Sequence, residues 1–280
     1  MTAPGTGRGA TRRGDPPPAP EPLPVPVWDS HCHLDMVGGP VEDVLAAGRA
    51  VGVDRVVTIG VDLESSRYAA QVAAAHPDVL AAVALHPNEA GAFAATEEAL
   101  AEIARLAALP QVVAVGETGL DHYRTEGEEG RRAQEESFRR HIAIAKETGC
   151  ALVIHDREAH EPVLRVLLEE GAPDRTVFHC FSGDAAMARV CADRGYVLSF
   201  AGNVTFKNAD GLRDAARVTP RDLLLVETDA PFLTPMPHRG APNAPYLVPL
   251  TLRALADVRA EDVAELGAAV AATSRRVFGG

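Results

Sequence analysis

Histidine and carboxylate side chains gather in the stretch 27–35, which reads VWDSHCHLD. His31 and His33 are two residues apart, so on a β-strand both imidazoles point to one face and Cys32 points to the other. Imidazole nitrogen is a good ligand for Zn²⁺ and similar transition metals, whereas carboxylate oxygens also bind Mn²⁺ or Mg²⁺. The pair therefore predicts a metal site. We expect Asp29 to orient one of the two imidazoles.

Further imidazoles and carboxylates follow later in the chain, each directly after a short apolar run. They are His86, Glu117, His155, His179 and Asp229. A single histidine in such a place is usually a hydrogen-bonded core or loop residue. Buried carboxylates and imidazoles in this number are costly unless they are partnered or bound to metal. We therefore expect the side chains to converge, with a two-metal centre bridged by Glu117 as the economical arrangement.

The apolar runs before these residues have the composition of β-strands, and they alternate with Ala-, Glu- and Arg-rich segments of helical period. Most of the runs are continuously apolar, as expected for parallel strands that are covered on both faces. We predict strands over residues 26–33, 54–61, 79–86, 111–117, 151–155, 175–180, 196–201 and 223–228. We predict helices over residues 97–108, 130–148, 184–194, 246–258 and 260–278.

About eight such strand–helix units in roughly 250 residues fit an α/β fold, namely a TIM (β/α)8 barrel in a single domain. Active sites in this fold lie at the C-terminal ends of the strands, where the histidines and carboxylates are expected. An open doubly wound sheet is the alternative, but no G-x-G-x-x-G or G-x-x-x-x-G-K-[ST] sequence favours it. We predict that residues 1–25, which are rich in proline, form a disordered tail and that residues 26–280 form the barrel.

The charge of the chain limits how it could bind an anionic substrate. It has 27 Lys and Arg residues against 39 Asp and Glu residues, a formal net charge of -12. This argues against a surface that binds nucleic acid non-specifically, so an anionic substrate needs a local positive site. The chain has 4 cysteines without a C-x-x-C pair, and we find no export signal or membrane span. We expect a cytoplasmic protein with reduced thiols, no membrane contact and no obligate protein partner.

Four side chains are candidates for binding substrate beside the metal: His86, Arg157, Lys207 and Arg239. Arg157 follows His155 by two residues, and its guanidinium fork suits a phosphate oxygen; the alternative is a salt bridge with Glu158 or Glu161. Lys207 and Arg239 fall on the loops after the seventh and eighth strands, where barrels often bind phosphate. Solvated surface charges would explain them equally well. Phe181 could stack on a base or pack in the core.

The candidate residues other than Lys207 and Arg239 belong to a series of seven short motifs that follow one another along the chain. The motifs are DSHCHLD at 29–35, LHP at 85–87, GETGLD at 116–121, IHDR at 154–157, HCFSG at 179–183, SFAG at 199–202 and ETDAP at 227–231. The series resembles that of the TatD-family metal-dependent deoxyribonucleases, from about residue 27 to the C-terminus. The sequence departs from the family pattern at His122, where an aromatic residue is usual, at Thr118, usually aliphatic, and at Ala84, usually glycine.

The resemblance implies a barrel of the amidohydrolase-like kind and a divalent-metal hydrolase that acts on DNA. By position, it implies six metal ligands: His31, His33, Glu117, His155, His179 and Asp229. From the types of these ligands we expect one or two ions of Zn, Mn or Mg. We interpret Asp229 as both a ligand and the general base, and Glu117 as the bridging ligand.

Three hypotheses about function remain open at this point. The leading one is an exonuclease that uses a metal-activated water to hydrolyse phosphodiester bonds at DNA ends or in single-stranded DNA. The second keeps the metal centre but gives it an ester or amide substrate, such as an aminoacyl-tRNA or a small metabolite. The third is a metal-binding scaffold that has no catalytic activity.

Overall fold

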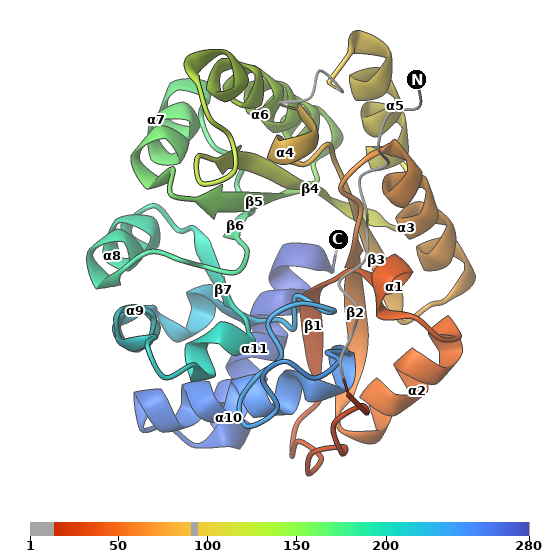
Figure 1. The fold of residues 1–280 in the computed structure, drawn as a ribbon, viewed down its shortest axis with the longest axis vertical. Coiled ribbons are helices and arrows are strands. Elements are labelled where there is room, and N and C mark those ends of the chain that lie inside the picture. Colours follow the sequence, from red (N-terminus) through yellow and green to blue (C-terminus); the bar gives the residue numbers. More distant parts are fainter. Residues whose placement is uncertain (1–13, 91–94, 280) are drawn as a thin grey trace.

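The computed structural model describes residues 14–90 and 95–279, in which eight parallel strands form one sheet in sequence order. Each strand is hydrogen-bonded to the next along the chain, and the helices surround the strands (Figure 1). The strands are β1 (Val27–Cys32), β2 (Val53–Ile59), β3 (Val79–Val83), β4 (Val112–Asp121), β5 (Ala151–Arg157), β6 (Thr176–Phe178), β7 (Val197–Phe200) and β8 (Leu224–Val226). All eight predicted strands are present, and β4 continues four residues beyond its predicted end.

The sheet curls into a barrel that is nearly closed between the last strand and the first. The segment after β8 pairs with the end of β1, because the Asp229 amide donates to the His31 carbonyl at 2.9 Å and the His33 amide donates to the Ala230 carbonyl at 2.8 Å. Deeper in the barrel, the Ser30 hydroxyl donates to the Val226 carbonyl at 3.0 Å. The predicted TIM barrel is thus confirmed.

The helices cover the outside of this barrel. They are α1 (Leu34–Val37), α2 (Val41–Ala50), α3 (Leu63–Ala75), α4 (Pro87–Ala90), α5 (Glu97–Ala107), α6 (Glu128–Thr148), α7 (His160–Glu170), α8 (Ala185–Asp193), α9 (Asp210–Val218), α10 (Val248–Arg259) and α11 (Val263–Phe278). Several begin at a residue whose side chain accepts a backbone N–H of the first turn: Asp62, Thr96, Asp184 and Asp262. Such N-caps fix where a helix begins, and hence the length of the loop before it.

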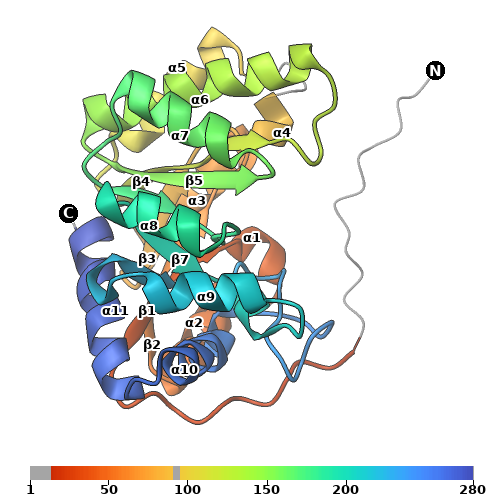
Figure 2. The ribbon, with the colours of Figure 1, turned by 90° about the vertical axis from the view of Figure 1, so that its left-hand side faces the viewer.

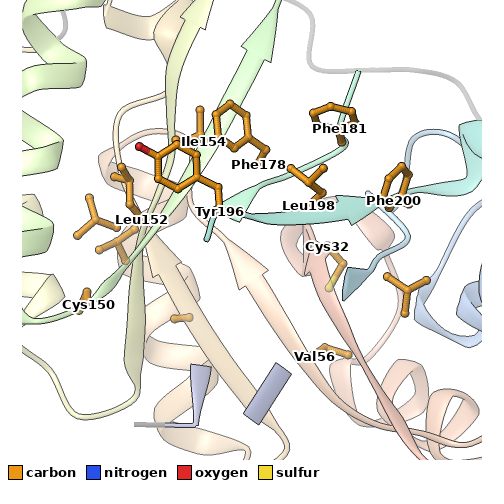
Figure 3. Packing of buried hydrophobic residues seen from close by; sticks show 14 of the residues in the cluster. Cys32, Val56, Cys150, Leu152, Ile154, Phe178, Phe181, Tyr196, Leu198 and Phe200 are labelled. Carbon is orange, nitrogen blue, oxygen red and sulfur yellow. The ribbon is translucent and has the colours of Figure 1, made fainter. Parts of the chain in front are cut away.

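Two hydrophobic clusters hold the strands in place. One fills the space between strands and helices, and it includes Leu152, Ile154, Phe178 and Cys32 (Figure 3). The other contains the alternate strand positions, such as Ala151 and Val153, and so lies inside the barrel. Because the strands are buried on both faces, they read as continuous apolar runs in the sequence. Cys32 packs on the helix side, as its position between two inward histidines requires.

Part of the predicted disordered tail needs correction. Residues 14–25 lie against the barrel in an extended conformation, and in Figure 2 this segment passes beside α10. Leu23 is buried and its amide donates to the Val51 carbonyl at 2.9 Å. The Arg253 guanidinium on α10 donates to the Glu21 carbonyl at 2.8 Å, and the Tyr246 hydroxyl donates to the Pro17 carbonyl at 2.7 Å. The proline-rich composition did not indicate these partners; the first half of the predicted tail lies outside the described residues.

Candidate metal centre

The imidazoles and carboxylates singled out in the sequence meet at the C-terminal ends of the strands. Three overlapping groups each place one possible ligand atom per residue within 4.8 Å of the others. The groups are His31, Glu117 and His179; His31, His33 and Asp229; and His86, Glu117 and His155. All six ligands implied by the family resemblance are therefore brought together, and His86, which we predicted to bind substrate, joins them.

Glu117 lies at the middle of this cluster and is 5% exposed. Its Oε2 is 2.9 Å from His179 Nε2 and 3.0 Å from His31 Nε2. Its Oε1 is 3.0 Å from His86 Nε2. Glu117 belongs to two of the metal-capable groups, one with His31 and His179 and one with His86 and His155, as a carboxylate that bridges two cations would.

Two buried atoms in the cluster indicate that a cation fits there. His31 Nε2 and Glu117 Oε2 are 3.0 Å apart, but neither makes a hydrogen bond of acceptable geometry with any described residue. A buried polar atom without a partner costs about 1–3 kcal/mol. A divalent cation bound between the two side chains would use both lone pairs and remove this cost. The donor set of nitrogen and oxygen is compatible with Zn²⁺, Mn²⁺ or Mg²⁺.

A carboxylate behind His179 sets the orientation of its ring. Glu227 is fully buried, and its Oε1 lies 3.3 Å from His179 Nδ1 and accepts the Cys180 amide at 2.8 Å. A proton held on Nδ1 leaves Nε2, the atom next to Glu117, with a free lone pair for a metal. Sequence reasoning missed Glu227. Its position in the predicted strand 223–228, two residues before Asp229, was the available signal.

His155 has a similar partner in Asp121, at the end of β4. Asp121 Oδ2 is 3.3 Å from His155 Nε2 and also accepts the Asn88 side-chain amide at 3.2 Å. Asp121 Oδ1 accepts the Arg124 amide at 2.9 Å, so both oxygens are held. This residue was missed because the strand was predicted to end at residue 117, although Asp121 closes the GETGLD motif.

Asp29 does not orient an imidazole, contrary to our expectation. Its carboxylate accepts the Thr228 amide at 2.9 Å and the Thr228 hydroxyl, and the His31 amide at 3.3 Å. These bonds join β1 to the segment after β8, so Asp29 contributes to closing the barrel. Burial raises the pKa of Asp29 to about 8, because the charged carboxylate loses its hydration there.

Protons and metal ions compete for this centre. Burial, and then the neighbouring His179, lower the pKa of His31. Burial also lowers the pKa of His179, but the Glu117 and Glu227 carboxylates outweigh it and raise that pKa well above its usual value. The pKa of Glu117 is held well below its usual range: burial raises it, but the charges of His179 and His86 dominate. A metal must displace the proton on His179, so metal affinity should fall as the pH falls.

His86 reaches the centre from the loop after β3. Its Nδ1 accepts the Asn88 amide at 3.1 Å, so the neutral ring carries its proton on Nε2, the atom 3.0 Å from Glu117 Oε1. This tautomer makes Nε2 a donor, either to the Glu117 carboxylate or to an oxygen of a substrate.

Arg157 lies at the mouth of the barrel, with its guanidinium carbon 4.0 Å from the centre of the Tyr123 ring. No carboxylate within residues 14–90 and 95–279 lies within 4.0 Å of this guanidinium, so the alternative of a salt bridge with Glu158 or Glu161 was wrong. Tyr123 is 58% exposed. The stacked pair therefore presents a cation and an aromatic face to solvent beside the metal cluster.

Lys207 and Arg239 do not join the metal cluster. They line a cleft between the loops after β6, β7 and β8. Phe181 is 2% exposed and its ring packs 5.9 Å from that of Phe200 (Figure 3), so it belongs to the core and cannot stack on a base.

Helix α6 supports the centre from outside through two buried polar side chains. His141 Nε2 accepts the Leu85 amide at 3.0 Å, and His141 Nδ1 donates to the Ser137 carbonyl at 2.7 Å. Gln134 donates to the Pro87 carbonyl at 3.1 Å and accepts the Asp121 amide at 3.0 Å. The two residues thus fix the backbone on either side of His86. Their seven-residue spacing on a helix, which places both on one face, was the sequence signal.

His141 should make the protein sensitive to acid. Burial lowers its pKa to about 4, against about 6.5 in an unfolded chain. Between these values the unfolded state binds more protons, so the free energy of unfolding falls as the pH drops, by about 2 kcal/mol at pH ~4.5. His141→Gln keeps an acceptor for the Leu85 amide and does not titrate. Denaturant unfolding with a chelator at pH ~7.5 and ~4.5 should therefore show a smaller acid loss in this variant, and parallel losses would contradict the assignment.

The chain is similar to known proteins along almost its whole length. Residues 28–279 match the family model described as TatD related DNase. The "Uncharacterized metal-dependent hydrolase TatD" of Mycobacterium tuberculosis is 48% identical over 258 residues, which are 90% of this chain and 97% of that protein. The "Uncharacterized metal-dependent hydrolase YcfH" of Escherichia coli K12 is 38% identical over 257 residues, 89% of this chain and 94% of that protein.

A solved structure shows the same architecture. The crystal structure of YJJV, a TatD homologue from Escherichia coli K12, superimposes with a TM-score of 0.83 at 26% identity. The match covers 91% of this chain and 98% of that one.

Proposed function

Because the chain belongs to the family of TatD related DNases and is a metal-dependent hydrolase, we propose that it hydrolyses phosphodiester bonds at the ends of DNA strands. The observation that carries the proposal is the position of Glu117, which belongs to one metal-capable group with His31 and His179 and to another that includes His155. Two-metal centres of this kind act on phosphodiesters by holding the attacking and the leaving oxygen.

In this proposal the centre holds one or two ions of Zn, Mn or Mg through six residues: His31, His33, Glu117, His155, His179 and Asp229. Bound divalent ions lower the pKa of water and polarise a phosphoryl oxygen. The carboxylates of Glu227 and Asp121 keep the rings of His179 and His155 in the orientation that ligation needs.

Asp229 is the proposed general base. Its Oδ1 lies 3.6 Å from His33 Nε2 and 3.7 Å from His31 Nε2, so it faces the cluster. Its side chain is 13% exposed, against 7% for Glu117, which makes it the more accessible of the two carboxylates to water. It would orient the attacking water and accept its proton.

The scissile phosphate is proposed to lie between His86 and Arg157. His86 would donate from Nε2 to one phosphate oxygen, and the Arg157 guanidinium would bind another. Phe232, which is 41% exposed, lies 5.9 Å from the His33 ring and could stack on a base next to this phosphate. Stacking requires an unpaired base, which favours single-stranded or frayed DNA ends as the substrate.

The proposed activity can be tested on end-labelled DNA. Protein stripped of metal with a chelator should be inactive, and Mg²⁺, Mn²⁺ or Zn²⁺ should each be tested for restoring stepwise shortening of a single-stranded oligonucleotide. We expect slower shortening of the same sequence in a blunt duplex, because its terminal bases are stacked and paired. If no metal restores shortening while a panel of esters and amides is hydrolysed, the second hypothesis of a non-nucleic-acid substrate replaces this one. If nothing is hydrolysed although metal is bound, the scaffold hypothesis holds.

The cytoplasm remains the proposed location. Cys32, Cys150, Cys180 and Cys191 are all free in the structure, as expected in a reducing compartment. No helix within the described residues is long and apolar enough to cross a membrane.

A further inference from the structure

A cleft of about 630 Å³ opens beside the metal cluster, between the loops after β6, β7 and β8. Its lining includes Ser182 and Asp184 from the first loop, Asn203, Phe206 and Lys207 from the second, and Arg239 from the third. The volume lies within the range of about 300–1,000 Å³ that is typical of sites for small ligands. We call it the Phe206 cleft. None of the six proposed metal ligands lines it.

The charges in the Phe206 cleft favour an anion. Lys207 and Arg239 are exposed, and no carboxylate of the described residues lies within 4.0 Å of either. The acidic residue in the lining, Asp184, accepts the Met187 amide at 2.9 Å and caps α8. The cleft thus contains two cations without ion-pair partners. Because the chain has a net charge of -12, binding of an anionic substrate requires a local positive site of this kind.

The same cleft offers a surface on which a base can stack. The guanidinium carbon of Arg239 lies 4.4 Å from the centre of the half-buried Phe206 ring. Aromatic rings and guanidinium planes are the surfaces on which unpaired bases stack in proteins that bind single strands. The lining residue Asn203 also has a buried Oδ1 without a hydrogen-bond partner among the described residues.

The walls of the cleft are held in place before any ligand binds. A Cβ on Gly202 would lie 2.1 Å from the Leu233 carbonyl oxygen, so the loops after β7 and β8 can approach this closely only because residue 202 is glycine. The Met236 amide donates to the Thr205 hydroxyl at 2.8 Å, and Arg213 donates to the Phe206 carbonyl at 2.7 Å. A site that is already ordered loses less entropy on binding.

The inner end of the cleft adjoins segments that carry metal-cluster residues. The Asn203 side-chain amide is 3.7 Å from the sulfur of Cys180, the residue after His179. The Ser182 hydroxyl donates to the Asp156 carbonyl at 3.0 Å, directly after His155. The cleft therefore lies next to the two segments that carry His155 and His179.

We propose that the Phe206 cleft binds one nucleotide of the substrate strand, the neighbour of the nucleotide that is being removed. Its base would lie against Arg239 and Phe206, and its phosphate against Lys207. The inference rests on the proposed function and adds a determinant of specificity to it. The neighbouring base must be unpaired to enter the cleft, so the cleft selects single strands. Because every base can stack on an aromatic ring, the cleft accepts any of the four bases.

Lysine reactivity tests the proposal directly, because the chain has only two lysines, Lys146 and Lys207. Lys146 donates to the Glu170 carbonyl near the end of α6, outside the cleft, and serves as an internal control. The Asp229→Asn variant with Mg²⁺ is acetylated with and without a thymidine decanucleotide, and both sites are read by mass spectrometry. We expect protection of Lys207 by about fivefold or more and an unchanged rate at Lys146. Equal protection of both lysines, or none, overturns the proposal.

A variant series gives a second readout that does not depend on chemical labelling. Phe206→Ala should weaken binding of the same oligonucleotide, measured by fluorescence anisotropy, by about fivefold or more. Lys207→Ala should weaken it and make binding less sensitive to salt. The matched control is Leu168→Ala, at an exposed position on α7. Circular dichroism establishes that each variant is folded, and unchanged affinity in both cleft variants contradicts the proposal.

The two proposals fail in different ways. If wild-type protein shortens DNA but Lys207 is not protected, the cleft proposal fails and the nuclease proposal stands. If Lys207 is protected but no DNA is shortened with any metal, the cleft binds a single strand and the nuclease proposal fails.

Discussion

Asp229→Asn should reduce kcat for shortening of single-stranded DNA by about 10²–10⁴-fold, the usual contribution of a general base. The amide has the shape of the carboxylate but cannot accept a proton from water. Its oxygen can still face the cluster, where Asp229 Oδ1 lies 3.6 Å from His33 Nε2. Metal content should therefore fall much less than the rate, because His31 and His33 remain in the same group.

The test measures kcat and metal per chain in the same preparation. Asp193→Asn is the matched control, because it makes the same change at an exposed position in the last turn of α8. Its rate should equal that of the wild type. If Asp229→Asn retains more than about a tenth of the wild-type kcat, Asp229 is not the general base.

Glu117→Gln should remove metal as well as activity. Glu117 is shared by two of the three metal-capable groups and has an oxygen facing each, whereas an amide offers one good ligand oxygen and carries no charge. We expect the affinity for at least one ion to fall by about 100-fold or more. Mutation of residues that only hydrogen-bond to metal ligands already lowers metal affinity by about 10–100-fold. Activity should fall by about 10²–10⁴-fold at limiting metal.

Two measurements separate this variant from Asp229→Asn. The metal content is measured after dialysis against limiting metal, and the activity is then measured at increasing metal concentrations. Excess metal should restore part of the Glu117→Gln activity but none of the Asp229→Asn activity. Glu158→Gln, at an exposed position after β5, is the control and should behave as wild type. Full metal content in Glu117→Gln under limiting conditions would contradict the bridging assignment.

The sequence was sufficient to predict the barrel, because its strands are buried on both faces and read as apolar runs separated by helical segments. It was also sufficient to predict which polar residues would converge. In a barrel of parallel strands every C-terminal end lies at one mouth, so a residue such as His31 or His179 is placed there by its position after a strand.

The partners of these residues depended on the tertiary structure. Glu227 and Asp121 hold histidines that lie 48 and 34 positions away in the chain. His141 binds the backbone 56 positions away, next to His86. A hydrogen bond between residues so far apart in the sequence depends on how strands and helices pack against one another. The local periodicity of the sequence therefore cannot predict it. The ordered segment 14–25 was missed for the same reason, since its partners lie on α10 and before β2.

The residue types and their order along the chain determined that this protein carries a cluster of imidazoles and carboxylates at one end of a barrel. That much follows because strand periodicity and the direction of parallel strands are local properties of the sequence. Only the tertiary structure decided that Glu117 stands between two sets of imidazoles, and that Lys207 and Arg239 face a separate cleft with Phe206. These relations depend on the curvature of the sheet and the packing of its loops, which bring together atoms from strands on opposite sides of the barrel.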